Sequence, residues 1–325
     1  MAWGTLSTAR INGLVLDGAR ESELAEFVAV ASRDRTRGER FAREHGIERV
    51  HDSYEALLAD DEVEAVYIPL PNSMHVDWSV RALEAGKHVL SEKPLARDPD
   101  AAERAFAAAE RAGRLLSEGF MWRHHPQTRR LAELVAEGAV GELRLVRSSF
   151  SFLLDDPENV RLSAELEGGS LMDVGCYCVS ASRLFGGELP ESVYGQARMD
   201  DGVDVRFAAT LRFPGDVTAS FDCGFDMVAR HDLELVGTEG SLFAADPWHS
   251  RRPGIERRGP DGELERIEVA RANSYALELD DMSVAIRDGG SPLLGRDDAL
   301  GQARTIEALY ASAAAGSAVA IEEER

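Results

Sequence analysis

Lysine is nearly absent from this sequence. Arginine supplies 34 of the 36 basic residues, and the two lysines are Lys87 and Lys93. Lysine differs from arginine because its ammonium group is compact and can lose its proton when buried. Lys93 precedes Pro94 at the end of a short apolar run, where α/β proteins gather ligand-binding groups. We predict that Lys93 is catalytic and that Lys87, beside Gly86, is a surface charge; the alternative is that both are surface charges.

Cysteine is scarce too, and long apolar runs are missing. Cys176, Cys178 and Cys223 form an odd set without clear metal-ligand spacing. We interpret them as reduced packing residues and assign no metal site. No apolar run approaches the ~20 residues of a membrane span, and the N-terminus lacks a signal-peptide pattern. We therefore expect a soluble, cytoplasmic protein.

Positive charge is also in short supply, since the formal net charge is -22. Such a chain repels nucleic acid phosphates and anionic membranes, so we expect neither as a partner. An anionic cofactor would need a local cluster of cations. One run of the sequence supplies it, with Arg33, Arg35, Arg37, Arg40 and Arg43.

Apolar runs and helical patterns alternate in the first part of the chain. Expected strands cover residues 3–6, 27–31, 65–69, 87–91 and 115–119, and expected helices cover 36–45, 53–59, 75–85 and 99–113. This alternation predicts a doubly wound parallel sheet, which we place in a domain at residues 1–120. The carboxyl ends of its strands, which line one crevice in this architecture, carry Thr8, Ser32, Asn72 and Lys93.

The turn after the first expected strand lacks the glycines of a dinucleotide-binding G-x-G-x-x-G motif. Ser7, Ala9 and Asn12 occupy the three glycine positions. The amides at a helix N-terminus can still bind a pyrophosphate, and a nearby hydroxyl can cap or donate. We predict cofactor contacts from Ser7, Thr8, Ala9 and Ile11; a plain strand-turn-helix is the alternative.

The second expected strand ends in Ser32 and Arg33, about 20 residues after the turn that follows the first strand. NAD-binding folds carry an acidic residue there for the ribose 2′-hydroxyl, whereas a small donor and a cation suit a 2′-phosphate. We therefore predict contacts from Ser32, Arg33 and Arg37 and favour NADP, with NAD possible as a cofactor. The alternative is that these arginines form one solvated helix face.

After residue 120 the pattern changes to strands without intervening helices. Expected strands cover residues 143–153, 203–213, 217–225, 232–236 and 241–244, a helix precedes them at 127–137, and helices at 273–287 and 297–315 close the chain. Residues 253–262 are polar and rich in turn formers, so we expect a loop there. We predict a second α/β domain, 121–325, with a large, mainly antiparallel open sheet.

The second candidate group of residues follows Gly168 and Gly169. A helix that begins near Ser170 would place Asp173 and Tyr177 four residues apart on one face. The alternative is structural. Ser170-x-x-Asp173 fits a capping box, and Tyr177 could be a core residue.

Together these motifs resemble the Gfo/Idh/MocA family of oxidoreductases over nearly the whole chain. The matching stretches are residues 28–34, 67–75, 85–94, 120–126 and 168–177. The resemblance implies a Rossmann domain, then an α/β domain whose open sheet commonly forms a subunit interface. It also implies that Lys93, Asp173 and Tyr177 surround the nicotinamide and the substrate carbon. Many members have His at the position of Tyr177. With Tyr there, the sequence resembles the branch that contains dihydrodiol dehydrogenases and NADP-dependent D-xylose dehydrogenases.

The resemblance implies reversible hydride transfer between a nicotinamide and a carbinol or carbonyl carbon of a sugar, polyol or dihydrodiol. Tyr177 would carry the proton, Lys93 would stabilise its phenolate, and Asp173 would orient the substrate or Lys93; the reverse allocation between Lys93 and Tyr177 stays open. Further cofactor contacts are expected from Leu70, Asn72, His75, Glu92 and Arg123. His124 and His125 are interpreted as structural.

Two alternative functions are considered. One is a nucleotide-binding sensor that has lost turnover, and another is a transhydrogenating oxidoreductase that retains its cofactor. We expect a homodimer or homotetramer through the C-terminal sheet, with a small sugar-like substrate.

Overall fold

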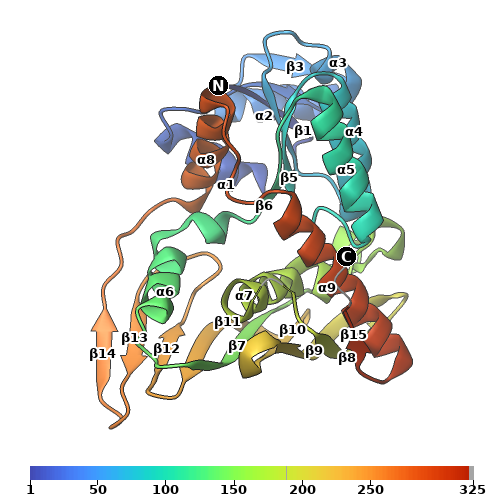
Figure 1. The fold of residues 1–325 in the computed structure, drawn as a ribbon. Coiled ribbons are helices and arrows are strands. Elements are labelled where there is room, and N and C mark those ends of the chain that lie inside the picture. Colours follow the sequence, from blue (N-terminus) through green and yellow to red (C-terminus); the bar gives the residue numbers. More distant parts are fainter. Residues whose placement is uncertain (188, 322–325) are drawn as a thin grey trace. The chain divides into compact units, whose positions relative to one another are not determined.

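The structure is a computed structural model that describes residues 1–187 and 189–321, and its chain forms two compact units. Unit 1 contains residues 1–121 and 273–300, and unit 2 contains residues 122–272 together with the described residues from 301 onward. Figure 1 follows the chain by colour. The chain therefore leaves unit 1 after residue 121, passes through residues 122–272 of unit 2 and returns to unit 1 with residues 273–300. A domain boundary near residue 120 remains our proposal.

Unit 1 is built on a six-stranded parallel sheet in the order β3-β2-β1-β4-β5-β6. Its strands are β1 (Ala2–Leu6), β2 (Glu26–Ala31), β3 (Arg49–His51), β4 (Ala65–Ile68), β5 (His88–Glu92) and β6 (Leu116–Gly119). The strands are mostly buried, as expected for a parallel sheet covered on both faces. The order reverses between β1 and β4, which is where doubly wound sheets bind ligands. The predicted parallel sheet is confirmed.

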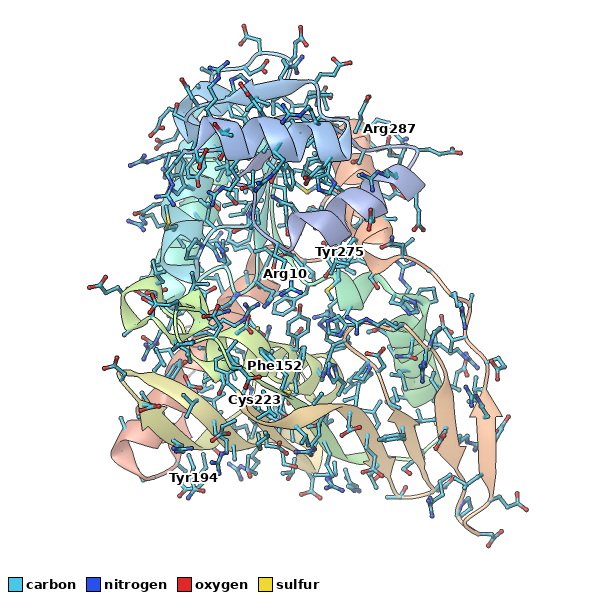
Figure 2. The ribbon with its side chains drawn as sticks, turned by 180° about the vertical axis from the view of Figure 1, so that it is seen from behind. Arg10, Phe152, Tyr194, Cys223, Tyr275 and Arg287 are labelled. Atoms are coloured by element: carbon cyan, nitrogen blue, oxygen red, sulfur yellow. The ribbon has the colours of Figure 1, made fainter. Side chains whose placement is uncertain are left out.

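Helices cover this sheet. They are α1 (Asn12–Glu21), α2 (Arg35–His45), α3 (Tyr54–Leu58), α4 (His75–Glu84), α5 (Pro99–Ala112) and, from the returning segment, α8 (Ser274–Asp288), with a short 3-10 turn η1 (Asn72–Met74). Gly18 of α1 lets α8 pack closely, because a Cβ there would lie 2.7 Å from the Cβ of Tyr275. Figure 2 labels Tyr275 where the two helices meet.

Unit 2 is built on a nine-stranded sheet in the order β14-β13-β12-β11-β7-β10-β9-β8-β15. The strands are β7 (Leu143–Leu153), β8 (Ser192–Asp200), β9 (Val203–Phe213), β10 (Val217–Gly224), β11 (Asp226–Gly237), β12 (Ser241–Ala244), β13 (Ile255–Arg258), β14 (Leu264–Ile267) and β15 (Val319–Ala320). Among the strands that the structure describes in this sheet, only β7 and β10 pair in parallel. The predicted mainly antiparallel sheet is confirmed. The stretch 253–262 contains β13, so the expectation of a loop there was wrong. The sequence of β13 is mostly polar and therefore lacks the apolar pattern that predicts a strand, but the strand pairs with β12 and β14.

One face of this sheet is covered. The π-helix η5 (Leu171–Gly175) leads into α7 (Cys176–Gly186), and both pack on β7 and β10. Figure 2 shows Cys223 of β10 and Tyr194 of β8 on opposite faces. Other helical elements are α6 (Pro126–Ala136), α9 (Arg296–Ala315), which unit 1 and unit 2 share, and the 3-10 turns η2 (Met121–His124), η3 (Val160–Leu162), η4 (Ala164–Leu166) and η6 (Pro214–Asp216). Among the described residues, every helix is too short or too polar to cross a bilayer.

Candidate active site

The turn between β1 and α1 has the shape of a glycine turn although it starts with serine. Ser7 has φ 97°, a left-handed value that glycine adopts most readily. Its backbone amide donates to the Ala31 carbonyl at 2.9 Å, and its hydroxyl accepts from the Ala9 amide at 3.2 Å. The structure thus holds Ser7 in the conformation that the first glycine of a dinucleotide motif would supply.

Asn12, at the third glycine position, fixes this turn from inside. Its Nδ2 donates to the Ser7 carbonyl at 2.7 Å, and its Oδ1 accepts from the Thr5 hydroxyl at 3.1 Å. The side chain is buried. The backbone amides of Arg10 and Ile11 make no hydrogen bond to other described residues. These amides open a helix N-terminus, which is a suitable place for a phosphate.

Replacing Asn12 with alanine is expected to lower the free energy of unfolding by about 2–3 kcal/mol, because one buried and one partly buried hydrogen bond are lost and the Ser7 carbonyl loses its donor. Urea unfolding at pH 7 measures this. Cofactor affinity should fall as well, since the turn is no longer held. Unchanged unfolding would mean that Asn12 does not hold the turn.

The end of β2 places arginines beside a buried serine. Ser32 is buried, and its hydroxyl both donates to the Asp34 carbonyl at 2.8 Å and accepts from the Asp34 amide at 3.3 Å. Asp34 caps α2 by accepting from the Arg37 amide. The Arg33 and Arg37 side chains are exposed and pair with no described residue. The two guanidinium groups are therefore available to an anion.

The loops after β4 and β5 leave the same edge of the sheet, because Ile68 is paired with Ser91. The imidazole of His75 bridges them, with Nδ1 2.8 Å from the Pro94 carbonyl oxygen and Nε2 2.7 Å from the Leu70 carbonyl oxygen. Burial, with a smaller contribution from the charge of Lys93, lowers the pKa of His75 to about 4 against these two contacts. His75 thus links the loop with Asn72 to the loop with Lys93, and the Lys93-Pro94 peptide is cis.

The half-buried carboxylate of Glu92 lies beside this loop. The Tyr67 hydroxyl donates to Glu92 Oε1 at 2.5 Å, and burial together with Glu92 raises the pKa of Tyr67 well above its usual value. Burial likewise raises the pKa of Glu278, on α8, well above its usual value, with Glu92 adding to the shift. Glu92 is therefore held from β4 while Lys93 follows it at the strand end.

Lys87 is not a surface charge, so that prediction was wrong. Its side chain is 6% exposed, and Nζ donates to the carbonyls of Asp60 at 2.7 Å and Val63 at 2.8 Å. The chain between α3 and β4 turns here and leaves both carbonyls without strand partners. Lys87 ties this turn to β5, a structural role that spacing beside Gly86 could not indicate.

In unit 2, Tyr177 lies in an aromatic cluster. Its ring centroid is 5.3 Å from that of Phe150 on β7 and 5.8 Å from that of Trp248. Trp248 is buried and donates from Nε1 to the Ser149 carbonyl at 2.9 Å. Tyr177 is 7% exposed. These rings fix the phenol at the start of α7.

Asp173 is paired with an arginine that the sequence pattern did not indicate. Arg161 Nε donates to Asp173 Oδ2 at 2.6 Å. Ser170 instead donates to Asp204 Oδ2 at 2.7 Å and does not cap a helix. The capping-box alternative was therefore wrong, because the Ser170 side chain makes no cap hydrogen bond and Asp173 instead accepts from Arg161.

The other predicted residues lie as follows. Arg123 is in unit 2, where Nη1 donates to the Ser180 hydroxyl at 3.3 Å. His125 accepts from the Gln127 amide as the cap of α6, a contact that agrees with its interpretation as structural. His124 is buried, and burial lowers its pKa to about 3. Lys93 belongs to unit 1, and Asp173 and Tyr177 belong to unit 2.

Both units match one family. Residues 9–120 match an oxidoreductase family with an NAD-binding Rossmann fold, and residues 128–243 match the GFO/IDH/MocA C-terminal domain. The chain belongs to the Gfo/Idh/MocA oxidoreductase family. The predicted family and two-part α/β fold are confirmed.

Relatives of this family member include enzymes named for a sugar and for a diol. D-xylose 1-dehydrogenase (NADP(+)) 2 from Haloferax volcanii is 40% identical over 328 residues, which cover 99% of this chain and 100% of the relative. Trans-1,2-dihydrobenzene-1,2-diol dehydrogenase from Danio rerio is 33% identical over 247 residues, 74% of this chain and 73% of the relative. The predicted activity, an NAD(P)-dependent dehydrogenase or reductase acting on CH–OH groups, agrees with both.

A solved structure of an NADP-bound reductase has the same fold as this chain. A 3-ketoreductase from Actinomadura kijaniata in complex with NADP and TDP-benzene matches with a TM-score of 0.91 at 34% identity, covering 96% of this chain and 97% of that one. Crystal structures of the same enzyme include variants with one lysine replaced by alanine or glutamate and one tyrosine replaced by phenylalanine. The predicted cofactor, NADP, agrees with this complex and with the xylose dehydrogenase.

Proposed function

We propose that this Gfo/Idh/MocA member is an NADP-dependent oxidoreductase acting on a hydroxyl or carbonyl carbon of a sugar, a polyol or a dihydrodiol, with Lys93 and Tyr177 managing the proton. One observation carries the residue assignment. The lysine and tyrosine replaced in the Actinomadura ketoreductase are 84 positions apart, and Lys93 and Tyr177 are also 84 positions apart. The same fold and the same separation support equivalent roles.

In this account Tyr177 exchanges the proton of the substrate oxygen. The bound nicotinamide supplies or accepts the hydride. An ordinary Tyr has a pKa of about 10, so a cation is needed to favour the phenolate. We assign that part to Lys93, which also polarises the substrate oxygen. The packing of Phe150 and Trp248 on Tyr177 would keep the phenol in one orientation.

Asp173 would act with Arg161 as a substrate-positioning pair. The carboxylate accepts from Arg161 through Oδ2 and is 14% exposed in its side chain. Its second oxygen has the right chemistry to accept from a substrate hydroxyl. The Arg161 guanidinium would hold the carboxylate in place while it accepts from a substrate hydroxyl.

Arg33 and Arg37 would bind the 2′-phosphate of NADP. Both guanidinium groups lack a partner among the described residues, and Ser32 at the strand end is neutral where an NAD-binding fold would carry an acid. The amides of Arg10 and Ile11 would receive the pyrophosphate. On unit 1, Leu70, Asn72, His75 and Glu92 would complete the cofactor contacts, and Arg123 of unit 2 stays a proposed contact.

Arg33→Ala is expected to weaken NADPH binding by about 10- to 100-fold and to leave NADH binding unchanged, because charge-assisted bonds to the phosphate are lost. Fluorescence titration of both cofactors measures the ratio. Arg35→Ala is the matched control, since Arg35 Nε already pairs with Glu39 Oε1 at 2.9 Å. Equal loss for NADPH and NADH would contradict this assignment, and so would tighter NADH binding by the native protein.

The substrate can be identified by measuring turnover of a panel of compounds. A panel of aldoses, inositols, ketosugars and trans-dihydrodiols is tested with both nicotinamide cofactors. We expect turnover of at least one aldose or diol with NADP. No turnover across the panel, with cofactor binding retained, would favour the nucleotide-binding sensor. An absorbance spectrum that shows a copurified nucleotide would favour the transhydrogenating enzyme.

We also propose a cytoplasmic homodimer or homotetramer formed through the open face of the unit 2 sheet. Along β9 the buried side chains alternate with exposed ones, including Arg206 and Arg212. Tyr194 projects from the same uncovered face (Figure 2). Light scattering after size exclusion should give a multiple of 35.4 kDa, and a charge reversal at Arg212 should lower it.

A further inference from the structure

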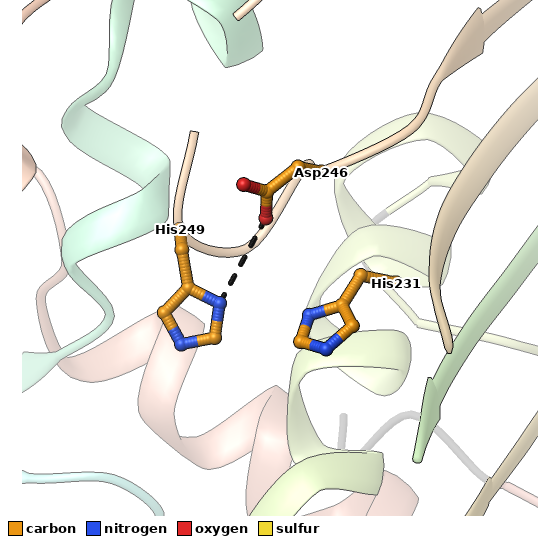
Figure 3. A group of neighbouring side chains, drawn as sticks. All are labelled: His231, Asp246 and His249. Carbon is orange, nitrogen blue, oxygen red and sulfur yellow. Dashed lines mark ion pairs between the residues drawn. The ribbon is translucent and has the colours of Figure 1, made fainter. Parts of the chain in front are cut away.

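Three potential metal ligands meet in unit 2 outside the residues assigned above. His231 lies on β11, and Asp246 and His249 lie on the turn that follows β12. One ligand atom from each lies within 4.8 Å of the other two. Figure 3 shows the two imidazoles facing the Asp246 carboxylate. All three residues are half-buried, so an ion could enter from solvent.

The turn holds Asp246 ready to bind through one oxygen. Its Oδ2 accepts from the Arg251 amide at 3.0 Å, and its backbone carbonyl accepts from the Ser250 amide at 3.0 Å. Oδ1 lies 3.8 Å from His249 Nδ1, which is longer than a hydrogen bond. A carboxylate fixed through one oxygen while the other faces imidazole nitrogens resembles a metal ligand with its outer-sphere partner.

The two imidazoles are held in place by a shared aromatic neighbour. The Phe150 ring centroid is 4.8 Å from that of His231 and 5.7 Å from that of His249. The Nδ1 atom of His231 is buried and has no hydrogen-bond partner among the described residues. A buried nitrogen without a partner is costly, and a bound cation would satisfy it.

We propose that His231, Asp246 and His249 bind a divalent transition-metal ion of the zinc class. Two imidazoles and one carboxylate suit Zn²⁺, Co²⁺ or Ni²⁺, whereas Mg²⁺ and Ca²⁺ prefer oxygen ligands alone. Three protein ligands leave one coordination position for water. Ligand bonds of about 2.0–2.2 Å require the donor atoms to draw closer than they now lie, which side-chain rotation permits.

The charges around the site are mixed. Asp246 and Asp232 act on His231 as negative groups, and Arg251 acts as a positive one. Asp232 already accepts from the Ser149 hydroxyl at 3.0 Å. The ion would join β11 to the turn after β12 and would brace Phe150, the ring on which Tyr177 packs. It would therefore stabilise unit 2 without taking part in hydride transfer.

The test is a Co²⁺ titration of the full chain, without a histidine tag and after treatment with a chelator. We expect one Co²⁺ per chain, with visible ligand-field absorption and a rise in the melting temperature of unit 2. His231→Gln, Asp246→Asn and His249→Gln should each weaken binding by more than about 100-fold, since the loss of outer-shell partners alone costs 10- to 100-fold.

His51→Gln is the matched control. His51 Nε2 lies 3.0 Å from Asp60 Oδ2 in unit 1, and the pair belongs to no group of three ligands found in the described chain. It should bind Co²⁺ like the native protein. Native binding by the three variants, or no stoichiometric Co²⁺ binding, would overturn the proposal. X-ray absorption of the Co²⁺ form gives a second measure that needs no variant, and fewer than two imidazole ligands would overturn it as well.

Discussion

Tyr177→Phe is expected to lower kcat by about 10²- to 10⁴-fold, the usual contribution of a positioned proton donor or acceptor. The KM should change little, because the ring that packs on Phe150 and Trp248 is kept and only the hydroxyl is removed. Steady-state kinetics with the best substrate of the panel measures both constants. Circular dichroism and cofactor titration show whether the variant is folded and binds NADP.

Tyr194→Phe is the control for this change. Tyr194 lies on the open face of the sheet, and its hydroxyl accepts from Gln196 Nε2 at 3.0 Å. Its kcat should equal that of the native enzyme. If Tyr177→Phe retained activity within a few-fold of native, Tyr177 would be a binding residue and Lys93 would be the remaining proton carrier.

Lys93→Met is expected to lower kcat/KM by at least about 10³-fold, because the substrate oxygen and the Tyr177 phenolate would lose their cation. Methionine keeps much of the length of the side chain and removes its charge. The free energy of unfolding should change little, since Lys93 is half-buried at a loop. Kinetics and urea unfolding are measured on the same preparation.

Lys87→Met should lower stability and leave kcat unchanged, which is the opposite of the result expected for Lys93→Met. Each variant therefore serves as the control for the other. The Nζ of Lys87 donates to two carbonyls inside unit 1, so the free energy of unfolding should fall by about 2–4 kcal/mol. The folded fraction should keep native kcat. Loss of kcat in Lys87→Met together with native activity in Lys93→Met would reverse the assignment of the catalytic lysine.

Much of unit 1 could be predicted because five of its six strands have a local sequence signal; β3 (Arg49–His51), a short strand with half-buried side chains, was not predicted. The run 65–68 is wholly apolar and ends at a proline, and Gly46 follows α2 with φ 73°, where a left-handed residue ends a helix. Spacing also made Asp173 and Tyr177 candidates, since both belong to one short helical stretch. These signals lie within about ten residues of the groups that they position.

The remaining features depend on contacts between distant residues. A helix was predicted at residues 273–287, but its packing on α1 beside Gly18 has no local signal in the sequence. Arg161 meets Asp173 across a turn of irregular chain. His231 joins Asp246 and His249 only because β11 pairs with β12. Lys87 was misjudged for a related reason, because the carbonyls that it binds lie more than 20 residues away.

The central claim is that Lys93 and Tyr177 act on one substrate oxygen, and a double-mutant cycle in kcat/KM tests it most directly. Residues that act as a unit give strongly non-additive losses. We predict that Lys93→Met combined with Tyr177→Phe is about as slow as the slower single variant. A double variant whose loss equals the product of the two single losses would show that the two groups act independently and would contradict the account.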